Sequence, residues 1–249
     1  FSFLAEGLEV KLTYDKRKPR YLVTLEAAKV RLPGALTHRV EVTAALEANR
    51  VSLERVRAFM GESVAEFTGT LEDFRHPKID GQVRASVLLR DIEMSPVRQG
   101  FGVVSGTLHY SAERGFSIDG RVEGEQLAYG SKEFKLSRGR ISSGFHLTTS
   151  LLRLSGLTVE TPLGDWAGEA AMREWRGFEL NGEATRVDLD ALQAAFLDRP
   201  YAWSGTVRGP LSLQGELTEA GLRNGLAEAE LSIEPKDGEI PVNGQLDLV

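Results

Sequence analysis

The chain contains no cysteine among its 249 residues. Disulfide bonds and thiolate metal sites are therefore excluded, although this absence suits an exported protein as well as a cytosolic one. Long apolar runs are also missing, and nothing approaches the roughly 18 to 20 consecutive apolar residues that a transmembrane helix needs. We expect that no part of this sequence crosses a bilayer as a helix.

Positive charge is outnumbered, because 30 Lys and Arg residues stand against 36 Asp and Glu residues and the formal net charge at pH 7 is -6. Phosphate backbones are bound by clustered Lys and Arg, so we expect no nucleic-acid partner. The one dense basic cluster, Lys16-Arg17-Lys18-Pro19-Arg20, lies between alternating segments at 8–14 and 21–25. It is typical of a hairpin tip, which is either simply solvated or contacts lipid headgroups or another partner.

Catalytic signatures are missing as well. The four histidines have neither HxH nor HExxH spacing, and the chain has no GxSxG motif and no Gly-rich loop between a strand and a helix; they are His38, His76, His109 and His146. We expect no catalytic residue, no metal site and no cofactor. A β-sandwich glycoside hydrolase with two carboxylates among the 36 acidic residues remains an alternative. Glu66, Glu169 and Glu183 alternate with apolar residues, so we predict that they face solvent.

Alternation of apolar and polar residues is the strongest pattern that the chain does contain. From Trp203 to Leu217 every odd position is apolar or glycine, and every even position except Pro210 is polar. Side chains alternate between the two faces of a strand, so this pattern predicts half-buried β structure. The segment forms either one strand or two strands joined near Gly209-Pro210.

Glycine is enriched, at 26 of 249 residues, or about 10% against a usual 7%. Four segments place Asp-Gly or Asn-Gly between apolar residues: Ile79–Val83, Ile118–Val122, Leu180–Ala184 and Val242–Leu246. A two-residue turn would set Ile79 beside Gln82, whereas a continuous strand keeps Ile79, Gly81 and Val83 on one face. We therefore predict that these glycines lie inside strands on the apolar side, as do Gly69, Gly106 and Gly168.

Strand glycine loses entropy and offers no packing surface, so its repeated use requires a reason. Three reasons are available: the glycines mark bulges and bends of an ordinary sandwich, they allow strong local bending of the sheet, or they leave space on the apolar face for something that is not protein.

The chain also repeats itself. The segments Val51–Ile92 and Leu152–Leu192 share one order of strands and glycines, with Gly69 and Gly168 99 positions apart and Gly81 and Gly182 101 apart. We interpret residues 1–249 as one elongated β-repeat region cut from a longer chain, with pseudo-repeats at approximately 40–100 and 140–200.

Helix signals are few. Asp188–Leu197 has apolar residues at helical spacing, an aspartate for the N-cap and Pro200 beyond its end. Ser52–Met60 is a second candidate, because Leu53, Val56 and Met60 form one stripe. We predict a short helix at each.

The exit Val187–Leu192, followed by the alternating segment Trp203–Leu217, resembles the AsmA-like superfamily, in particular its TamB (translocation and assembly module) branch. The resemblance covers residues 40 to 249 approximately and rests on apolar and glycine patterns rather than catalytic motifs. It implies a long sheet folded into a U-shaped groove, a β-taco, in the periplasm of a double-membraned bacterium, with an inner-membrane anchor outside this sequence. It further implies phospholipid transport between the two membranes, and outer-membrane protein assembly with a barrel protein as partner.

We therefore expect an all-β fold, an elongated, curved, antiparallel-rich sheet forming an apolar-lined groove with one or two short helices. Its function would be non-enzymatic, with phospholipid acyl chains bound in the groove. The expected lining residues are Ile79, Val83, Ile118, Val122, Trp166, Leu180, Trp203, Val207, Leu211, Leu213 and Leu217. The expected small groove-facing residues are Gly69, Gly81, Gly106, Gly120, Gly168, Gly182 and Gly205. The alternative is a β-sandwich or β-solenoid protein-interaction module without lipid.

Overall fold

The computed structural model describes residues 4–31, 37–91, 97–130, 135–196, 204–218, 221–234 and 244–248. Nearly all of these residues are in strands. The elements are β1 (Leu4–Asp15), β2 (Arg20–Arg31), β3 (Thr37–Glu47), β4 (Arg50–Met60), β5 (Ser63–Glu72), β6 (Lys78–Leu88), the 3-10 helix η1 (Leu89–Asp91), β7 (Val97–Ser111), β8 (Gly115–Gly130), β9 (Lys135–Thr148), β10 (Leu151–Thr161), β11 (Gly164–Arg173), β12 (Gly177–Asp188), the helix α1 (Leu189–Phe196), β13 (Thr206–Thr218), β14 (Gly221–Glu234) and β15 (Gly244–Leu248).

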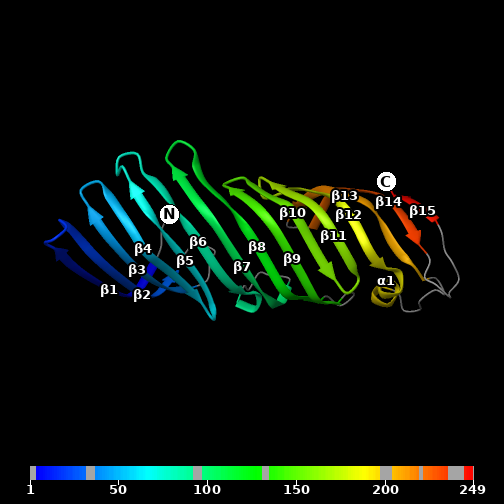
Figure 1. Cartoon of the computed structure of the whole chain (residues 1–249), viewed down its shortest axis with the longest axis horizontal. Helices are drawn as coiled ribbons and strands as arrows, with labels where there is room; N and C mark the ends of the chain where they lie inside the picture. The colour runs from blue at the N-terminus through cyan, green and yellow to red at the C-terminus, as the bar shows by residue number, and fades with distance from the viewer. Residues whose placement is uncertain are drawn as a thin grey trace. The chain divides into compact units, whose positions relative to one another are not determined.

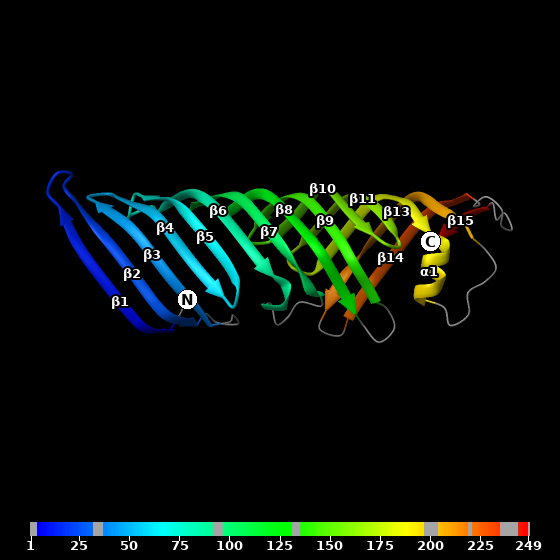
Figure 2. The same ribbon diagram turned by 60° about the horizontal axis from the view of Figure 1, so that its bottom comes forward.

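The hydrogen-bonded strand order follows the sequence from β1 to β15 (Figure 1). Neighbouring strands pair antiparallel from β1 to β6 and from β9 to β15. The predicted all-β, antiparallel-rich sheet is thus confirmed. The chain divides into two contact units, Phe1–Glu93 with Gly102–Gly120 and Met94–Phe101 with Arg121–Val249, and each is described by itself below. In the first unit β1 to β5 lie side by side (Figure 2).

The basic cluster forms a turn, as predicted, because residues 16–19 connect β1 to β2. The Asp15 carboxylate organises this turn by accepting hydrogen bonds from the backbone N–H groups of Arg17 at 3.0 Å and Lys18 at 3.5 Å. An aspartate that bonds to N–H groups two and three residues ahead is a usual way to fix a tight turn.

The glycines of three of the Asp-Gly and Asn-Gly segments lie inside strands, which confirms the prediction that these segments are continuous strands and not two-residue turns. Ile79–Val83 lies in β6, Ile118–Val122 in β8 and Leu180–Ala184 in β12. Along β6 the odd residues from Ile79 to Val87 are half-buried and the even ones from Lys78 to Ser86 are exposed. In the fourth segment Val242 and Asn243 lie outside the described residues, and Gly244 begins β15.

One strand, β13, continues through Gly209-Pro210, so the single-strand interpretation of this region is right from Thr206 onward. Trp203 lies outside the described residues.

Only one of the two predicted helices exists. Helix α1 is present, and the Asp188 side chain caps it by accepting from the N–H groups of Asp190 at 2.9 Å and Ala191 at 3.1 Å. The prediction of a helix over Ser52–Met60 is wrong, because these residues belong to β4.

The reason for this error is a β-bulge in β4. Leu53 pairs with Gly69 and Val56 with Phe67, so three steps along β4 face two steps along β5. The extra residue shifts the alternation by one position, and Leu53, Val56 and Met60 then share a face at a spacing that imitates a helix.

Few apolar residues of the described segments are fully buried. Within the described chain the buried hydrophobic residues are mainly small: Ala27, Ala44, Ala45, Leu157, Val207 and Ala229. The exposed surface is 17004 Å² for a mass of 27.3 kDa, whereas a compact protein of that mass exposes about 11,000 Å². Several large apolar side chains are also exposed: Leu8, Val10, Leu12, Tyr14, Tyr21, Phe74 and Trp175. None of the described helices has the length and apolarity to span a bilayer.

Candidate functional site

In the first unit, pairing aligns apolar residues into rows across β1 to β6. Each of the four rows holds one residue from each strand, and all 24 residues are apolar or glycine. We call these 24 residues the first apolar face. The rows are Leu8–Ala27–Val40–Ala58–Ala65–Ala85, Val10–Leu25–Val42–Val56–Phe67–Val83, Leu12–Val23–Ala44–Leu53–Gly69–Gly81 and Tyr14–Tyr21–Leu46–Val51–Leu71–Ile79. The bulge in β4 preserves the rows, because it moves Val56 and Ala58 onto the same face as Leu53.

The opposite face of the same strands is mainly polar and charged, although Leu22, Ala45, Phe59 and Val64 also lie on it. One row there runs Glu9–Glu26–Glu41–Arg57–Glu66–Arg84. The Arg57 guanidinium Nε lies 2.5 Å from Glu66 Oε1, so Glu66 belongs to an ion pair on this polar face. The sheet is therefore amphipathic, with carboxylates and guanidinium groups on one side and hydrocarbon on the other.

In the second unit, the strands β11 to β14 form a second apolar face. Its first row is Trp166–Ala184–Gly209. The next two rows are Gly168–Gly182–Leu211–Ala229 and Ala170–Leu180–Leu213–Ala227. Val207 lies between Val187 and Ile233. The structure thus brings together five expected lining residues, Trp166, Leu180, Val207, Leu211 and Leu213, of which Val207 is buried and the others are half-buried.

The remaining expected lining residues are distributed as follows. Ile79 and Val83 lie in the first apolar face, where they pair with Leu71 and Phe67. Ile118 and Val122 are half-buried residues of β8. Leu217 belongs to β13, but its side chain is outside the described part of the chain, as is the whole of Trp203.

Two glycine pairs on these faces are covered by aromatic rings. Gly69 pairs with Gly81, and a Cβ added at Gly81 would lie only 2.4 Å from the ring of Phe67. Gly168 pairs with Gly182, and a Cβ added at Gly182 would lie 2.5 Å from the ring of Trp166. The ring comes in each case from the residue two positions before the first glycine, as in the rescue of strand glycines by aromatic neighbours.

This packing argues against one of the three reasons considered for the strand glycines, namely that they leave space open above the sheet. The rings of Phe67 and Trp166 fill the space above Gly69, Gly81, Gly168 and Gly182. At these four positions the apolar surface is therefore formed by an aromatic ring. The sequence did not single out Phe67, although its position before Gly69 matches that of Trp166 before Gly168.

The other expected small residues have close backbone neighbours. A Cβ at Gly106 would lie 2.7 Å from the carbonyl oxygen of Asp119 and 3.2 Å from Cα of Gly120, so Gly106 and Gly120 are adjacent. Gly205 is buried, and a Cβ there would lie 2.7 Å from the carbonyl oxygen of Glu234. Bulky residues at these positions would disturb the sheet rather than merely obstruct its face.

Among the described residues, no group of three or more His, Asp or Glu side chains could hold a metal ion. His76 lies in the β5–β6 turn and His109 Nδ1 is 2.5 Å from Asp80 Oδ1 on the polar face. His38 and His146 lie in β3 and β9. Glu169 and Glu183 are exposed, as predicted.

An open hollow of about 700 Å³ in the second unit is polar. Its wall includes Arg140, Glu160 and Asp165, which pair in one row on the polar side of β9 to β11, and Arg186, which forms an ion pair with Asp165. Positive and negative side chains balance one another in the wall of this hollow. The row Arg140–Glu160–Asp165 alternates with the apolar row Ile141–Val159–Trp166, so the hollow lies on the side of the sheet opposite the apolar residues.

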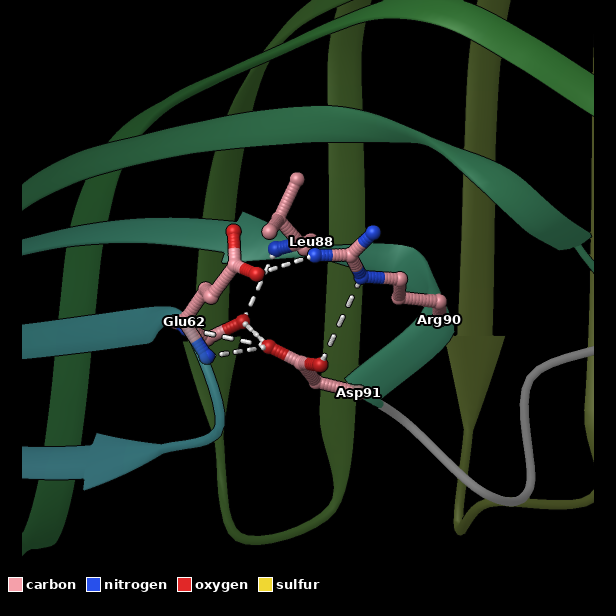
Figure 3. Close-up of polar contacts among 5 residues, drawn as sticks. Glu62, Leu88, Arg90 and Asp91 are labelled. Carbon is pink, nitrogen blue, oxygen red and sulfur yellow. Dashed lines mark hydrogen bonds and ion pairs between the residues drawn. The ribbon is translucent and has the colours of Figure 1, made fainter.

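Asp91 joins the end of η1 to the β4–β5 turn (Figure 3). Its carboxylate accepts from the Ser63 hydroxyl at 2.7 Å and from the N–H groups of Ser63 and Glu62 at 3.0 Å each. The Ser63 hydroxyl in turn accepts from the N–H of Leu88 at 2.8 Å, and Arg90 pairs with Glu62. The Ser63 hydrogen bonds hold the pKa of Asp91 below its ordinary value of 3.8. We call this cluster of Glu62, Ser63, Leu88, Arg90 and Asp91 the clasp, because it ties η1 to the β4–β5 turn.

Comparison with known proteins gave no match: no family model, no curated protein and no solved structure matches this chain.

Proposed function

We propose that the apolar faces bind phospholipid acyl chains, and that the chain is a segment of a non-enzymatic conduit for phospholipids between the inner and outer membranes. The observation that supports this is the first apolar face, where every residue of the four aligned rows except Ala27 and Ala44 remains half-buried or exposed. A face of this kind in water requires a cover. Acyl chains supply one, because each methylene transferred from water contributes about 0.8 kcal/mol.

The chemistry of the faces suits transport rather than one tight site. The rows offer hydrocarbon side chains without a buried charge or a deep polar contact, so a lipid would meet similar surroundings from one strand to the next. The polar faces remain in water. On this proposal the protein works in the periplasm, and the AsmA-like, TamB-type resemblance adds outer-membrane protein assembly with a barrel protein as a related role.

Burial favours this proposal over a protein-interaction module of the sandwich type. A closed sandwich buries its inward Leu, Ile and Val side chains between two sheets. Here Leu180, Leu211 and Leu213 are only half-buried. A glycoside hydrolase is disfavoured by the placement of Glu66, Glu169 and Glu183, which point away from the apolar faces.

The test is lipid extraction from protein purified without detergent, with the phospholipid per chain measured by mass spectrometry. We expect stoichiometric lipid in the wild type and the loss of most of it in Leu211→Asn/Leu213→Asn. The matched control is Ser212→Asn/Gln214→Asn on the polar face of the same strand, which keeps its lipid. Circular dichroism establishes that both variants are folded. Lipid-free, monomeric wild-type protein would overturn the proposal.

A further inference from the structure

The β1–β2 hairpin combines the most exposed part of the first apolar face with a free basic tip. Leu8, Val10 and Leu12 are 54%, 58% and 60% exposed, and Tyr14 and Tyr21 are 49% and 48% exposed. All five lie on one face of two paired strands. Large apolar side chains gathered in this way mark a binding surface.

The cations at the tip are available for a ligand. Arg20 Nε lies 3.8 Å from Asp15 Oδ2, and an Arg20 terminal nitrogen lies 3.9 Å from Glu54. Asp15 also accepts from two turn N–H groups, so its charge is engaged. Lys16, Arg17 and Lys18 are exposed and form no ion pair within the described residues, which leaves three positive charges in three consecutive positions.

These groups follow one another along the hairpin in the order that a phospholipid requires. The basic turn comes first, then the Tyr14–Tyr21 pair with ring centroids 5.1 Å apart, and then the aliphatic side chains from Leu12 to Leu8. Aromatic rings with a polar tip favour the boundary between headgroup and hydrocarbon. From Tyr14 to Leu8 the strand rises about 20 Å, which exceeds the roughly 15 Å depth of one hydrocarbon leaflet.

We propose that this hairpin seats a single anionic phospholipid, with its phosphate on Lys16, Arg17 and Lys18 and its acyl chains along the apolar face from Tyr14 and Tyr21 to Leu8. The proposal rests on the function proposed above and deepens it by naming a lipid class and a site. The opposite face of the hairpin, with Glu9 and Lys11, stays in water.

Photo-cross-linking tests the seat directly. A benzoylphenylalanine is placed at Leu12 on the apolar face or, as the matched control, at Lys11 on the polar face. The probe is short-chain phosphatidylglycerol below its micelle concentration, and phosphatidylcholine with the same acyl chains is the neutral-headgroup comparison. We expect labelling at Leu12 and not at Lys11, with apparent affinity for phosphatidylglycerol about tenfold above that for phosphatidylcholine.

Charge variants test the headgroup contact. In the Leu12 cross-linking protein, Lys16→Gln/Arg17→Gln/Lys18→Gln should weaken phosphatidylglycerol labelling about tenfold. The control Lys11→Gln/Arg84→Gln/Arg114→Gln removes the same net charge elsewhere in the first unit and should leave labelling unchanged. Inorganic phosphate should compete only weakly, because it lacks the acyl chains.

Four results would overturn the proposal: equal labelling by the two lipids, no effect of the tip variant, labelling of vesicles but not of monomeric lipid, or chain-to-chain cross-links at Leu12. The third would assign the hairpin to a bilayer surface and the fourth to a second copy of the chain. Failure of this proposal can be distinguished from failure of the proposed function. The latter is tested by the amount of co-purified lipid and by the Leu211→Asn/Leu213→Asn variant in the other unit.

Discussion

At the scale of single residues, Phe67 shows how a strand tolerates two facing glycines. Its ring occupies the volume that two side chains would otherwise fill above Gly69 and Gly81. We expect Phe67→Ala to lower the free energy of unfolding by about 1–2 kcal/mol, less than the 3–5 kcal/mol of a fully buried phenylalanine because Phe67 is half-buried. Urea unfolding measures this, and Phe74→Ala at the exposed β5–β6 turn, with an effect below about 0.5 kcal/mol, is the control. Equal effects at the two positions would contradict the covering role of Phe67.

Ser63 is the residue on which the clasp depends, since its buried hydroxyl both donates to Asp91 and accepts from Leu88 N–H. In Ser63→Ala the Leu88 N–H loses this acceptor, so the free energy of unfolding should fall by about 1–3 kcal/mol. Glu62→Gln changes an exposed side chain of the same turn and should have little effect in the same urea measurement. A Ser63→Ala protein as stable as the wild type would show that the clasp is dispensable.

The clasp also predicts a dependence on pH. The pKa of Asp91 lies below its ordinary value of 3.8 in the folded protein, chiefly because of the Ser63 hydroxyl. The stabilisation is therefore present above pH 3.8 and is lost as the pH falls through the lower, folded pKa. Thermal unfolding across this acid range should show a smaller acid loss in Ser63→Ala than in the wild type, and parallel curves would refute the linkage.

At the scale of elements, Asp188 determines where β12 ends and α1 begins. Its side chain caps two helix N–H groups, its own N–H donates to the Leu163 carbonyl at 2.8 Å, and Leu189 N–H donates to the Gly205 carbonyl at 3.0 Å. We expect Asp188→Ala to lower the free energy of unfolding by about 1 kcal/mol, and Asp188→Ser to restore most of it. Chemical denaturation compares the two variants. Failure of the serine to restore stability would assign the effect to another contact of Asp188.

Strands were predictable from the sequence wherever the alternation ran unbroken. In β6 and β13 the period of two extends over whole elements, so the strand, the apolar face and the positions of the glycines all follow from residue order. In β4 the alternation breaks at Glu54-Arg55, and a local pattern cannot distinguish a bulged strand from a helix. That distinction depends on pairing with Gly69 and Phe67, which are distant in sequence.

The candidate site shows the same division. The apolar identity of Leu180, Leu211 and Leu213 is a local property and could be predicted. The ring of Trp166 above Gly182 could not, because it depends on the cross-strand register of β11 and β12. The exposed hairpin stem Leu8–Leu12 was likewise not singled out, since exposure at the end of a sheet is a property of strand order.

At the scale of the whole molecule, one module recurs in each unit. The bulge flanked by Leu53 and Val56 has its counterpart at Leu154 and Leu157, 101 positions later, and the exposed aromatic Phe74 has its counterpart at Trp175, also 101 later. Left-handed acidic residues, Asp73 and Glu174, precede these two aromatics. The predicted pseudo-repeats thus share a bulge, a covered glycine pair and an aromatic turn, which is more than a repeated composition.

The open apolar faces make a prediction about cooperative unfolding. An unfolded chain of this mass exposes about 40,000 Å², so unfolding from 17004 Å² exposes about 23,000 Å², against about 29,000 Å² for a compact protein. Because the denaturant m-value scales with this difference, delipidated protein should show a urea m-value about a fifth below that of a compact protein of equal length. Stoichiometric phospholipid should increase the denaturant midpoint, since it binds the folded faces and not the unfolded chain. Urea titrations with and without lipid, checked by sedimentation for a monomer, measure both effects. A monomer with the m-value of a compact protein would mean that its own side chains cover the faces in solution, leaving no surface for acyl chains.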